Sequence, residues 1–153
     1  RYNHRYRLQN ESVAAHSFFV SLFCLKIMAK LQLDHETERQ VLILAALHDT
    51  AESRTSDIPH DVKSRYPDMQ EILDRIEKEY YEEHWQKYIS DVYKPSEMVY
   101  NIIKLADAYS VYHYCLNENT LGNVSDEMTE IKNEALVRIT NYTATINALL
   151  KEV

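Results

Sequence analysis

Four polar side chains stand at positions where the surrounding sequence predicts apolar core residues. His16 interrupts one apolar stretch, His48 and Asp49 end another, and Asp107 interrupts a third, IIKLADAYSVY. Burying imidazole and carboxylate groups costs free energy unless they are hydrogen-bonded, paired or bound to a metal. Each has an ordinary explanation alone, such as a hydrogen-bonded core histidine or an aspartate paired with Lys104. Together, two imidazoles and two carboxylates from three segments can close around one divalent cation.

The mixed nitrogen and oxygen donors indicate which metals such a site would take. They suit a six-coordinate first-row ion with two positions left for water or substrate, and Mn²⁺, Co²⁺, Fe²⁺ and Zn²⁺ all fit. His48 and Asp49 are adjacent and would point about 100° apart on a helix, so the ion is expected beyond the helix end. Glu52 follows His48 by four residues, and on a continuing helix it would share that face and border the site.

The composition favours helices as the elements that position these residues. One glycine and three prolines occur in 153 residues, whereas sheets and tight hairpins use glycine in their turns. Apolar residues recur at helical spacing between caps and breakers. The expected helices cover residues 11–33, 34–52, 67–89, 96–118 and 125–150, with a short helix after Pro59. We therefore predict an all-α fold: one domain over residues 1–153, built as a single compact bundle of five to six helices.

Charge and cysteine usage exclude several classes of protein. The formal net charge is −7, so no large basic field is available to bind a nucleic-acid polymer. No apolar run approaches the ~18 residues that cross a bilayer, and no leader is recognisable, so neither a membrane partner nor secretion is expected. Cys24 and Cys115 match no metal-binding pattern. We expect them to be reduced, buried thiols of a cytoplasmic protein.

The order of the four polar residues, with the text around them, resembles the HD-domain superfamily of metal-dependent phosphohydrolases. SVAAHSFFV is similar to the first-histidine helix of bacterial 5'-deoxynucleotidases in that superfamily, LHDTAESRTSDIPHDVK to their HD loop, and KLADAYSVY to their last-aspartate helix. RYNHRYR aligns with their N-terminal arginine–aromatic segment. The resemblance covers roughly residues 1–115 and implies an HD-domain bundle, one divalent metal and a homodimer. The chain departs from the family pattern at Ala15, usually acidic, and at Ser56, often glycine.

The resemblance also implies roles for individual residues. The family's metal ligands correspond to His16, His48, Asp49 and Asp107, and its catalytic acid/base pair corresponds to Glu52 and Asp57. Its phosphate-binding arginine corresponds to Arg1, and the aromatic residue that packs near the sugar corresponds to Tyr2. Ser17 follows the first histidine, and it either reaches the phosphate or hydrogen-bonds back within its helix. The implied activity is removal of phosphate from (deoxy)nucleoside 5'-monophosphates. That reaction needs charge neutralisation on the phosphoryl group and controlled proton transfer.

Three other functions stay open at the level of the sequence. Related compact HD enzymes release triphosphate from nucleoside triphosphates, in some cases with selectivity such as that for dATP. A catalytically silent HD module would bind a nucleotide without hydrolysing it, although such a module has less need of Glu52 and Asp57. A purely structural helical protein would bind no metal. The product released from dAMP or dATP distinguishes the 5'-nucleotidase from the triphosphohydrolase. The silent module and the structural protein would release no product from either nucleotide.

Overall fold

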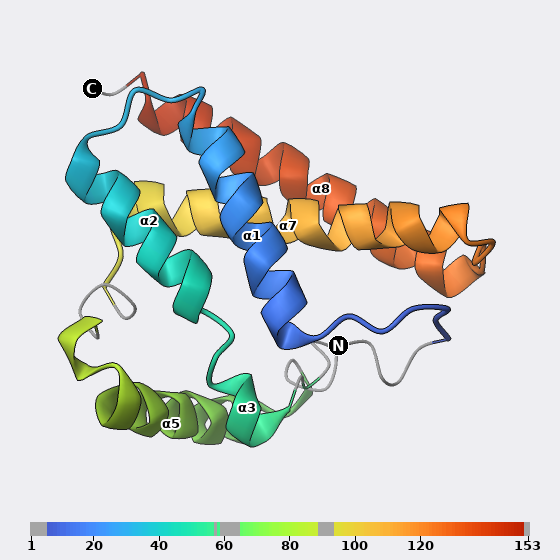
Figure 1. The fold of residues 1–153 in the computed structure, drawn as a ribbon, viewed down its shortest axis with the longest axis horizontal. Helices are drawn as coiled ribbons and strands as arrows, with labels where there is room; N and C mark the ends of the chain where they lie inside the picture. The colour runs from blue at the N-terminus through green and yellow to red at the C-terminus, as the bar shows by residue number, and fades with distance from the viewer. Residues whose placement is uncertain (1–5, 57, 59–64, 89–93, 152–153) are drawn as a thin grey trace.

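The chain folds into α-helices joined by turns (Figure 1). The computed structural model describes residues 6–56, 58, 65–88 and 94–151, and the structural statements below concern these residues. The elements are α1 (Val13–Met28), α2 (His35–Leu47), α3 (Glu52–Thr55), α5 (Pro67–His84), a 3₁₀ turn (Gln86–Tyr88), α7 (Glu97–Thr120) and α8 (Asp126–Leu149). No strand occurs among the described residues, and the all-α prediction is confirmed. The short helix expected after Pro59 lies outside them.

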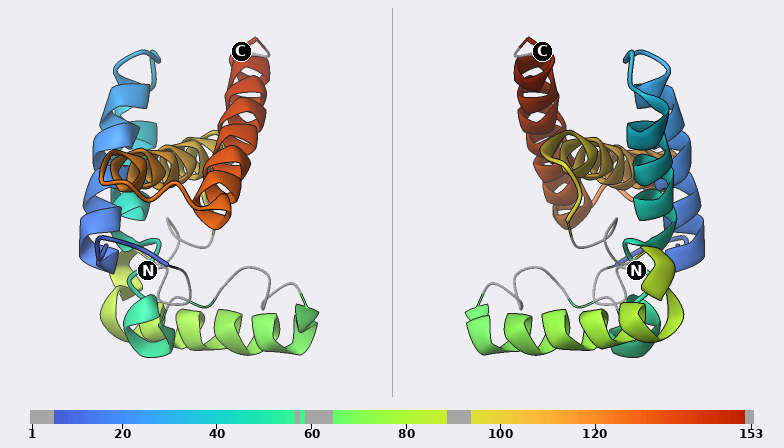
Figure 2. Two further views of the ribbon diagram at one scale, coloured as in Figure 1. Left: turned by 90° about the vertical axis from the view of Figure 1, so that its right-hand side faces the viewer. Right: turned by 90° about the vertical axis from the view of Figure 1, so that its left-hand side faces the viewer.

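The long helices are arranged around α7 (Figure 2). Helices α1 and α2 lie side by side and pack on α7 from one side, while α8 packs along α7 from the other. The main core lies where α1, α2 and α7 meet, and its fully buried members include Val20, Cys24, Val41, Ala45, Val99, Ile102 and Ala106. Cys24 and Cys115 are free and buried, as predicted. The same packing brings the middle of α7, which carries Asp107, against α1, which carries His16.

Helix α5 lies across one end of this arrangement and contacts α3 (Figures 1 and 2). The hydroxyl of Tyr81 is buried and donates a hydrogen bond to the carbonyl of Leu47, at the end of α2, at 2.5 Å. Arg54 of α3 pairs with Glu83 of α5. These contacts attach α5 to the segment that joins α2 to α3.

Capping residues in the sequence set most helix starts. Ser12 accepts a hydrogen bond from the amide of Ala15, and Ser96 and Ser125 cap α7 and α8 in the same way. Asp34 accepts two amide hydrogen bonds at the start of α2. Each side-chain oxygen satisfies amides that have no partner within the helix, so the sequence-based starts are close to the observed ones.

Helix α7 ends at the single glycine of the chain. Gly122 has a φ of 102°, a backbone conformation that costs glycine little because it has no Cβ. Its amide donates to the carbonyl of Asn119, and the amide of Asn123 donates to the carbonyl of Glu118. This pair of bonds is a Schellman motif, and it turns the chain back so that α8 packs along α7.

Three predicted helices are longer than the observed ones. The first ends at Met28 and α5 ends at His84, each followed by tighter turns. The second ends at Leu47 rather than at Glu52. The Leu47 carbonyl accepts hydrogen bonds from the amide and hydroxyl of Thr50 and from Tyr81, so the regular helical ladder stops there. The chain restarts at Glu52 as α3, and the prediction that Glu52 shares a helical face with His48 is wrong.

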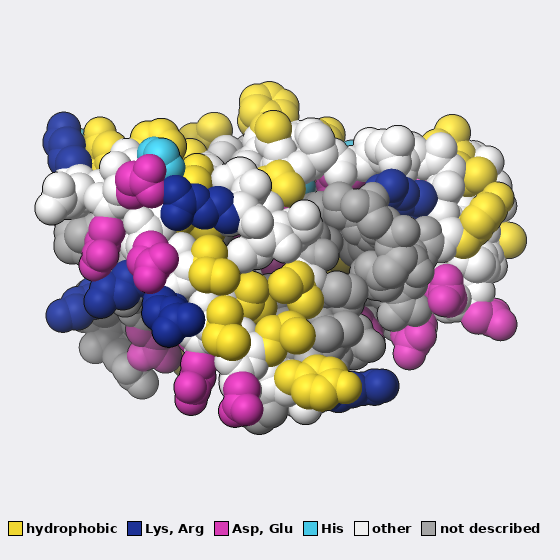
Figure 3. Space-filling view, turned by 90° about the horizontal axis from the view of Figure 1, so that it is seen from below, with side chains coloured by type: hydrophobic (Ala, Val, Ile, Leu, Met, Phe, Trp, Pro, Cys, Tyr) yellow, Lys and Arg dark blue, Asp and Glu magenta, His cyan; other side chains and the backbone are white. Residues whose placement is uncertain are grey.

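The face of the molecule seen from below combines apolar and charged side chains (Figure 3). Tyr66 and Ile72, at the start of α5, are among the exposed large hydrophobic residues. None of the described helices combines the length and apolar character needed to cross a membrane.

Candidate metal centre

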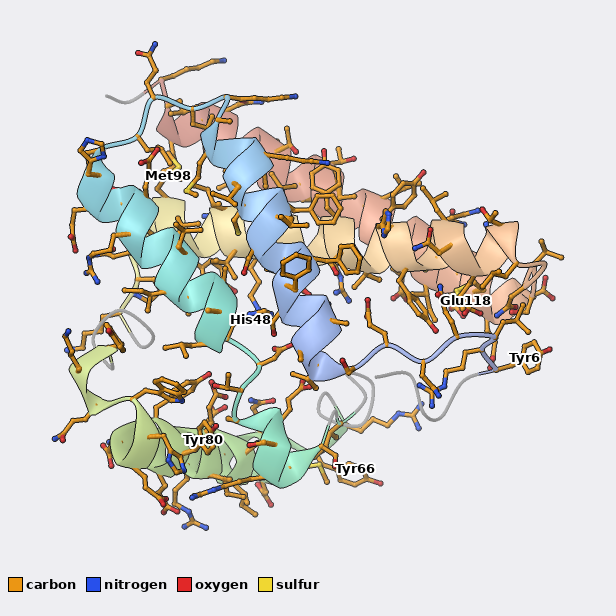
Figure 4. All side chains as sticks on the ribbon, in the orientation of Figure 1. Tyr6, His48, Tyr66, Tyr80, Met98 and Glu118 are labelled. Carbon is orange, nitrogen blue, oxygen red and sulfur yellow. The ribbon has the colours of Figure 1, made fainter. Side chains whose placement is uncertain are left out.

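Side chains from α1, α7 and the end of α2 meet at one point. His16 of α1 is completely buried, and its Nε2 lies 3.1 Å from Oδ1 of Asp107 on α7. The same nitrogen lies 3.4 Å from Oδ2 of Asp49, which is also 3.4 Å from Nε2 of His48. Figure 4 shows His48 at the end of α2 beside α1. The structure thus brings together the four residues that the sequence analysis selected, and their role as ligands stays a prediction.

The spacing of the donor atoms suits a small divalent ion. First-row metals hold nitrogen and oxygen ligands at about 2.0–2.2 Å, so neighbouring ligands of a six-coordinate ion lie about 3 Å apart. One ligand atom each from His16, His48 and Asp49 forms a set in which all atoms lie within 4.8 Å of one another. A carboxylate oxygen of Asp107 lies near Nε2 of His16. These residues can therefore hold a divalent metal.

The orientation of His48 supports the same conclusion. Its Nδ1 lies 2.9 Å from the carbonyl oxygen of Ala45. A carbonyl can only accept a hydrogen bond, so Nδ1 is the donor, and this tautomer leaves Nε2 as the nitrogen that can bind a metal. That nitrogen is buried and has no hydrogen-bond partner among the described residues. Metal-binding histidines are oriented in this way by a backbone carbonyl.

Ser110 orients the other histidine and was missed by sequence reasoning. Its hydroxyl lies 3.0 Å from Nδ1 of His16. When Nδ1–H donates to that oxygen, Nε2 is the nitrogen that faces the carboxylates of Asp49 and Asp107. Ser110 follows Asp107 by three residues on α7, and both therefore lie on one face of the helix. That spacing was the available signal.

A cavity of about 230 Å³ opens beside this cluster. Its polar lining residues come from the end of α2, from α3 and the following segment, from α5 and from α7: His48, Asp49, Glu52, Thr55, Ser56, Gln70, Glu77 and Lys104. Glu52 thus reaches the predicted neighbourhood, but from the first turn of α3 rather than from a continued α2. The cavity can admit a small polar group next to the candidate metal ligands.

Ser17 faces a neighbouring groove rather than this cavity. The groove has a volume of about 570 Å³ and is lined by Ser17, Phe18, Glu52 and Tyr80, among others. The Ser17 hydroxyl oxygen is buried and has no hydrogen-bond partner among the described residues. The alternative in which Ser17 bonds back within its own helix is therefore not what the structure contains. The remaining selected residues, Arg1, Tyr2 and Asp57, lie outside the described part of the chain.

A polar cluster around a single carboxylate, that of Glu118, lies further along α7 (Figure 4). Glu118 is completely buried and accepts hydrogen bonds from the amides of Leu8, at 2.9 Å, and Gln9, at 2.8 Å. The amide side chain of Asn123 donates to it at 2.7 Å. Burial raises the pKa of Glu118, but these hydrogen bonds outweigh burial and hold the pKa below its ordinary value. The hydroxyl of Tyr114 donates to the Gln9 carbonyl, so this cluster fastens the segment before α1.

Comparison with known proteins places this chain among 5'-deoxynucleotidases. The family model described as 5'-deoxynucleotidase YfbR-like matches residues 1–149. The chain is 29% identical over 147 residues to a 5'-deoxynucleotidase of Shewanella oneidensis, covering 86% of this chain and 74% of that protein. It is 30% identical over 131 residues to a 5'-deoxynucleotidase of Vibrio vulnificus, covering 76% and 66% of the two chains. With its match over nearly the whole length, the chain belongs to the YfbR-like 5'-deoxynucleotidase family.

Proposed function

We propose that this chain is a metal-dependent 5'-nucleotidase that removes phosphate from (deoxy)nucleoside 5'-monophosphates. The observation that carries the proposal is the convergence of His16, His48, Asp49 and Asp107 beside a cavity that Glu52 lines. Membership of the YfbR-like family makes the chain a hydrolase of the 5'-nucleotidase class. The relatives named 5'-deoxynucleotidase support a deoxynucleotide as one of its substrates.

The chemistry requires three events at the phosphoryl group. Water attacks phosphorus, the bond from phosphorus to the 5'-oxygen breaks, and the departing oxygen takes up a proton, leaving a nucleoside and orthophosphate. A divalent metal held by the four ligand residues would supply Lewis-acid chemistry. Glu52 accepts a proton from the attacking water, because its carboxylate lines the cavity. By resemblance, Asp57 is the second member of this acid/base pair.

Substrate contacts in this proposal come from the N-terminal segment of the sequence and from α1. By resemblance to the family, Arg1 binds the phosphate and Tyr2 packs near the sugar. A guanidinium group suits this role because it can donate two parallel hydrogen bonds to phosphate oxygens. Ser17 is proposed as a further polar contact, since it lines the groove to which Glu52 also contributes.

Product identity tests the proposed reaction. The purified protein is incubated with dAMP and, separately, with dATP in the presence of Co²⁺ or Mn²⁺, and the released products are identified. Orthophosphate released from dAMP supports the proposal. Inorganic triphosphate released from dATP, with dAMP unchanged, would replace it with a triphosphohydrolase. Nucleotide binding without any product would indicate a silent binding module.

The native metal is proposed to be one of Co²⁺, Mn²⁺, Fe²⁺ or Zn²⁺, bound as one ion per chain. Titration of each metal into the chelator-treated protein, followed by calorimetry and elemental analysis, measures affinity and stoichiometry. One tight site that is lost on removal of a selected histidine supports the assignment. The absence of tight binding for all four metals would contradict it.

We further propose that the protein acts in the cytoplasm as a homodimer, with a nucleotide as substrate and with neither a membrane nor a nucleic-acid polymer as partner. The family resemblance supports the dimer. Light scattering of the purified protein measures its mass in solution, and a mass equal to one chain of 18.1 kDa would contradict the dimer.

A further inference from the structure

Three of the eleven residues that line the cavity beside the candidate metal centre are acidic. Asp49, Glu52 and Glu77 contribute carboxylates from three different parts of the fold. A phosphate monoester carries about two negative charges near pH 7. Carboxylates alone would repel such a substrate, because like charges at short range are unfavourable in a partly buried site. A positive charge on the cavity wall would therefore favour binding, in addition to the metal and the proposed contact from Arg1.

Lys104 supplies a positive charge to this wall. Among the described lining residues it is the one lysine or arginine. It lies on α7, three residues before Asp107, so the two side chains belong to one face of the helix. Lysine is a compact cation on a flexible stem and binds phosphate as a point charge.

The contacts of Lys104 leave its ammonium group available for a ligand. Pairing with Asp107 was the ordinary explanation for the spacing of these two residues, but the Asp107 carboxylate lies beside His16 instead. Within the described ranges, no carboxylate forms an ion pair with Lys104. Its Nζ lies 5.6 Å from the ring centroid of Tyr100, one turn earlier on α7. This cation–π contact supplies no anion, so among the described residues the charge of Lys104 has no counter-anion.

From this geometry we infer that Lys104 is a substrate-binding residue that donates a hydrogen bond to a phosphoryl oxygen in the cavity. This inference rests on the proposed function, because it places the phosphate of the nucleoside monophosphate in the cavity that Lys104 lines together with His48 and Glu52. The acidic groups then face the water and the metal, while Lys104 offsets charge on the phosphate. A charge-assisted hydrogen bond of this kind changes affinity about 10- to 100-fold.

Replacement of Lys104 by methionine tests the inference, because methionine retains much of the side-chain length and removes the charge. The metal-loaded Lys104→Met protein is expected to bind inorganic phosphate about 10- to 100-fold more weakly than wild type. Its KM for dAMP is expected to rise by the same factor. Its metal content is expected to equal that of wild type. Lys104→Arg, which keeps a cation, is expected to restore most of the phosphate affinity.

Lys26 provides a matched control within the same chain. Its Nζ also lies 5.6 Å from an aromatic ring, that of Phe23, but it lies on α1 and does not line the cavity. Lys26→Met is expected to leave the phosphate Kd and the KM unchanged. An equal loss of phosphate affinity in both variants would show that the effect comes from general surface charge, and it would overturn the inference. So would a wild-type phosphate Kd in Lys104→Met.

The measurements separate failure of this inference from failure of the proposed function. If the wild-type protein hydrolyses no 5'-monophosphate, the proposed function fails, and titration with inorganic phosphate still decides the role of Lys104. If wild type is active and Lys104→Met retains both KM and phosphate affinity, only the present inference fails. Should the methionine variant not fold, as judged by circular dichroism, Lys104→Gln takes its place in the same assays.

Discussion

Two acidic positions on α7 are buried in opposite ways. The Glu118 carboxylate is completely buried and receives hydrogen bonds from Leu8, Gln9 and Asn123. Asp107, eleven residues earlier on the same helix, has a side chain that is 20% exposed and lies against the imidazole of a buried histidine. The surroundings of Glu118 supply several donors to a single carboxylate. The surroundings of Asp107 gather carboxylates and imidazole nitrogens, which are all metal ligands.

We propose that the difference distinguishes a structural carboxylate, Glu118, from one placed for function, Asp107. A buried carboxylate satisfied by protein donors needs nothing further and stabilises the contacts it makes. Two carboxylates and two imidazoles in one place are stabilised much better by a cation than by one another. We therefore expect changes at the Asp107 end to alter metal binding and turnover, and changes at the Glu118 end to alter folding stability.

The largest effect is expected from Asp107→Ala. The variant should lose the metal and with it nearly all turnover, because an oxygen donor is removed from the candidate site. Elemental analysis after dialysis and an assay of phosphate release measure the two effects. Asp126→Ala, at an exposed position at the start of α8, is the control. If Asp107→Ala still binds one metal per chain and turns over normally, the proposed role of Asp107 in metal binding is wrong.

Glu52→Ala is expected to lower kcat about 10²- to 10⁴-fold while the metal stays bound, because the proposed role of this carboxylate is proton transfer and not metal binding. Turnover and metal content are measured on the same preparation. Glu79→Ala changes an exposed acid on α5 and serves as the control. Near-normal turnover in Glu52→Ala would show that the proton-transfer role belongs to another group.

Glu118→Gln is expected to lower the free energy of unfolding by about 1–3 kcal/mol. Both carboxylate oxygens accept hydrogen bonds, whereas an amide offers one acceptor and turns an NH₂ group toward another donor. Turnover per folded molecule should change little. Denaturant unfolding measures the loss, with exposed Glu134→Gln as the control. A loss of metal in place of a loss of stability would erase the contrast between the two ends of α7.

The stabilisation from Glu118 should also depend on pH. Its pKa lies below the ordinary value of 4.5, so the folded state favours the charged form. The stabilisation is then complete above the unfolded pKa and is lost as the pH falls through the folded pKa. Unfolding curves of wild type and Glu118→Gln should therefore converge as the pH is lowered below 4.5. A difference that is constant across this window would contradict the assignment of a charged carboxylate.

At the metal centre, a smaller effect is expected from Ser110→Ala than from Asp107→Ala. Loss of the hydroxyl that orients His16 should weaken metal affinity about 10- to 100-fold, as is typical for groups that hold a metal-binding histidine. Metal titration by calorimetry measures the change. Ser21→Ala is the matched control, because Ser21 bonds a backbone carbonyl of its own helix and does not contact His16. Equal affinities in wild type and Ser110→Ala would show that packing alone orients the ring.

Local signals explain what could be predicted from the sequence. Helical spacing and capping residues such as Ser12 and Ser125 act over a few residues, and the helix starts were predicted closely. The four polar residues could be selected because each interrupts an apolar face. Their convergence in space was inferred from chemistry, and it is present in the structure.

The features that were missed depend on contacts between distant parts of the chain. Helix α2 stops at Leu47 partly because Tyr81, from α5, binds its carbonyl, and no pattern near residue 47 reports this. Glu118 looks like an ordinary surface acid near a helix end, and its partners Leu8 and Gln9 lie more than 100 residues away. Domain organisation over residues 1–153 stays a prediction.

The attachment of α5 has a practical consequence for observing the centre. Trp85 is the single tryptophan of the chain, and it packs with Tyr81 against the end of α2. Its indole Nε1 is buried. Fluorescence excited selectively in tryptophan therefore comes from a residue next to the segment that carries His48. Detachment of α5 would expose this indole to water and shift its emission to the red, so the molecule contains its own optical reporter and needs no attached dye.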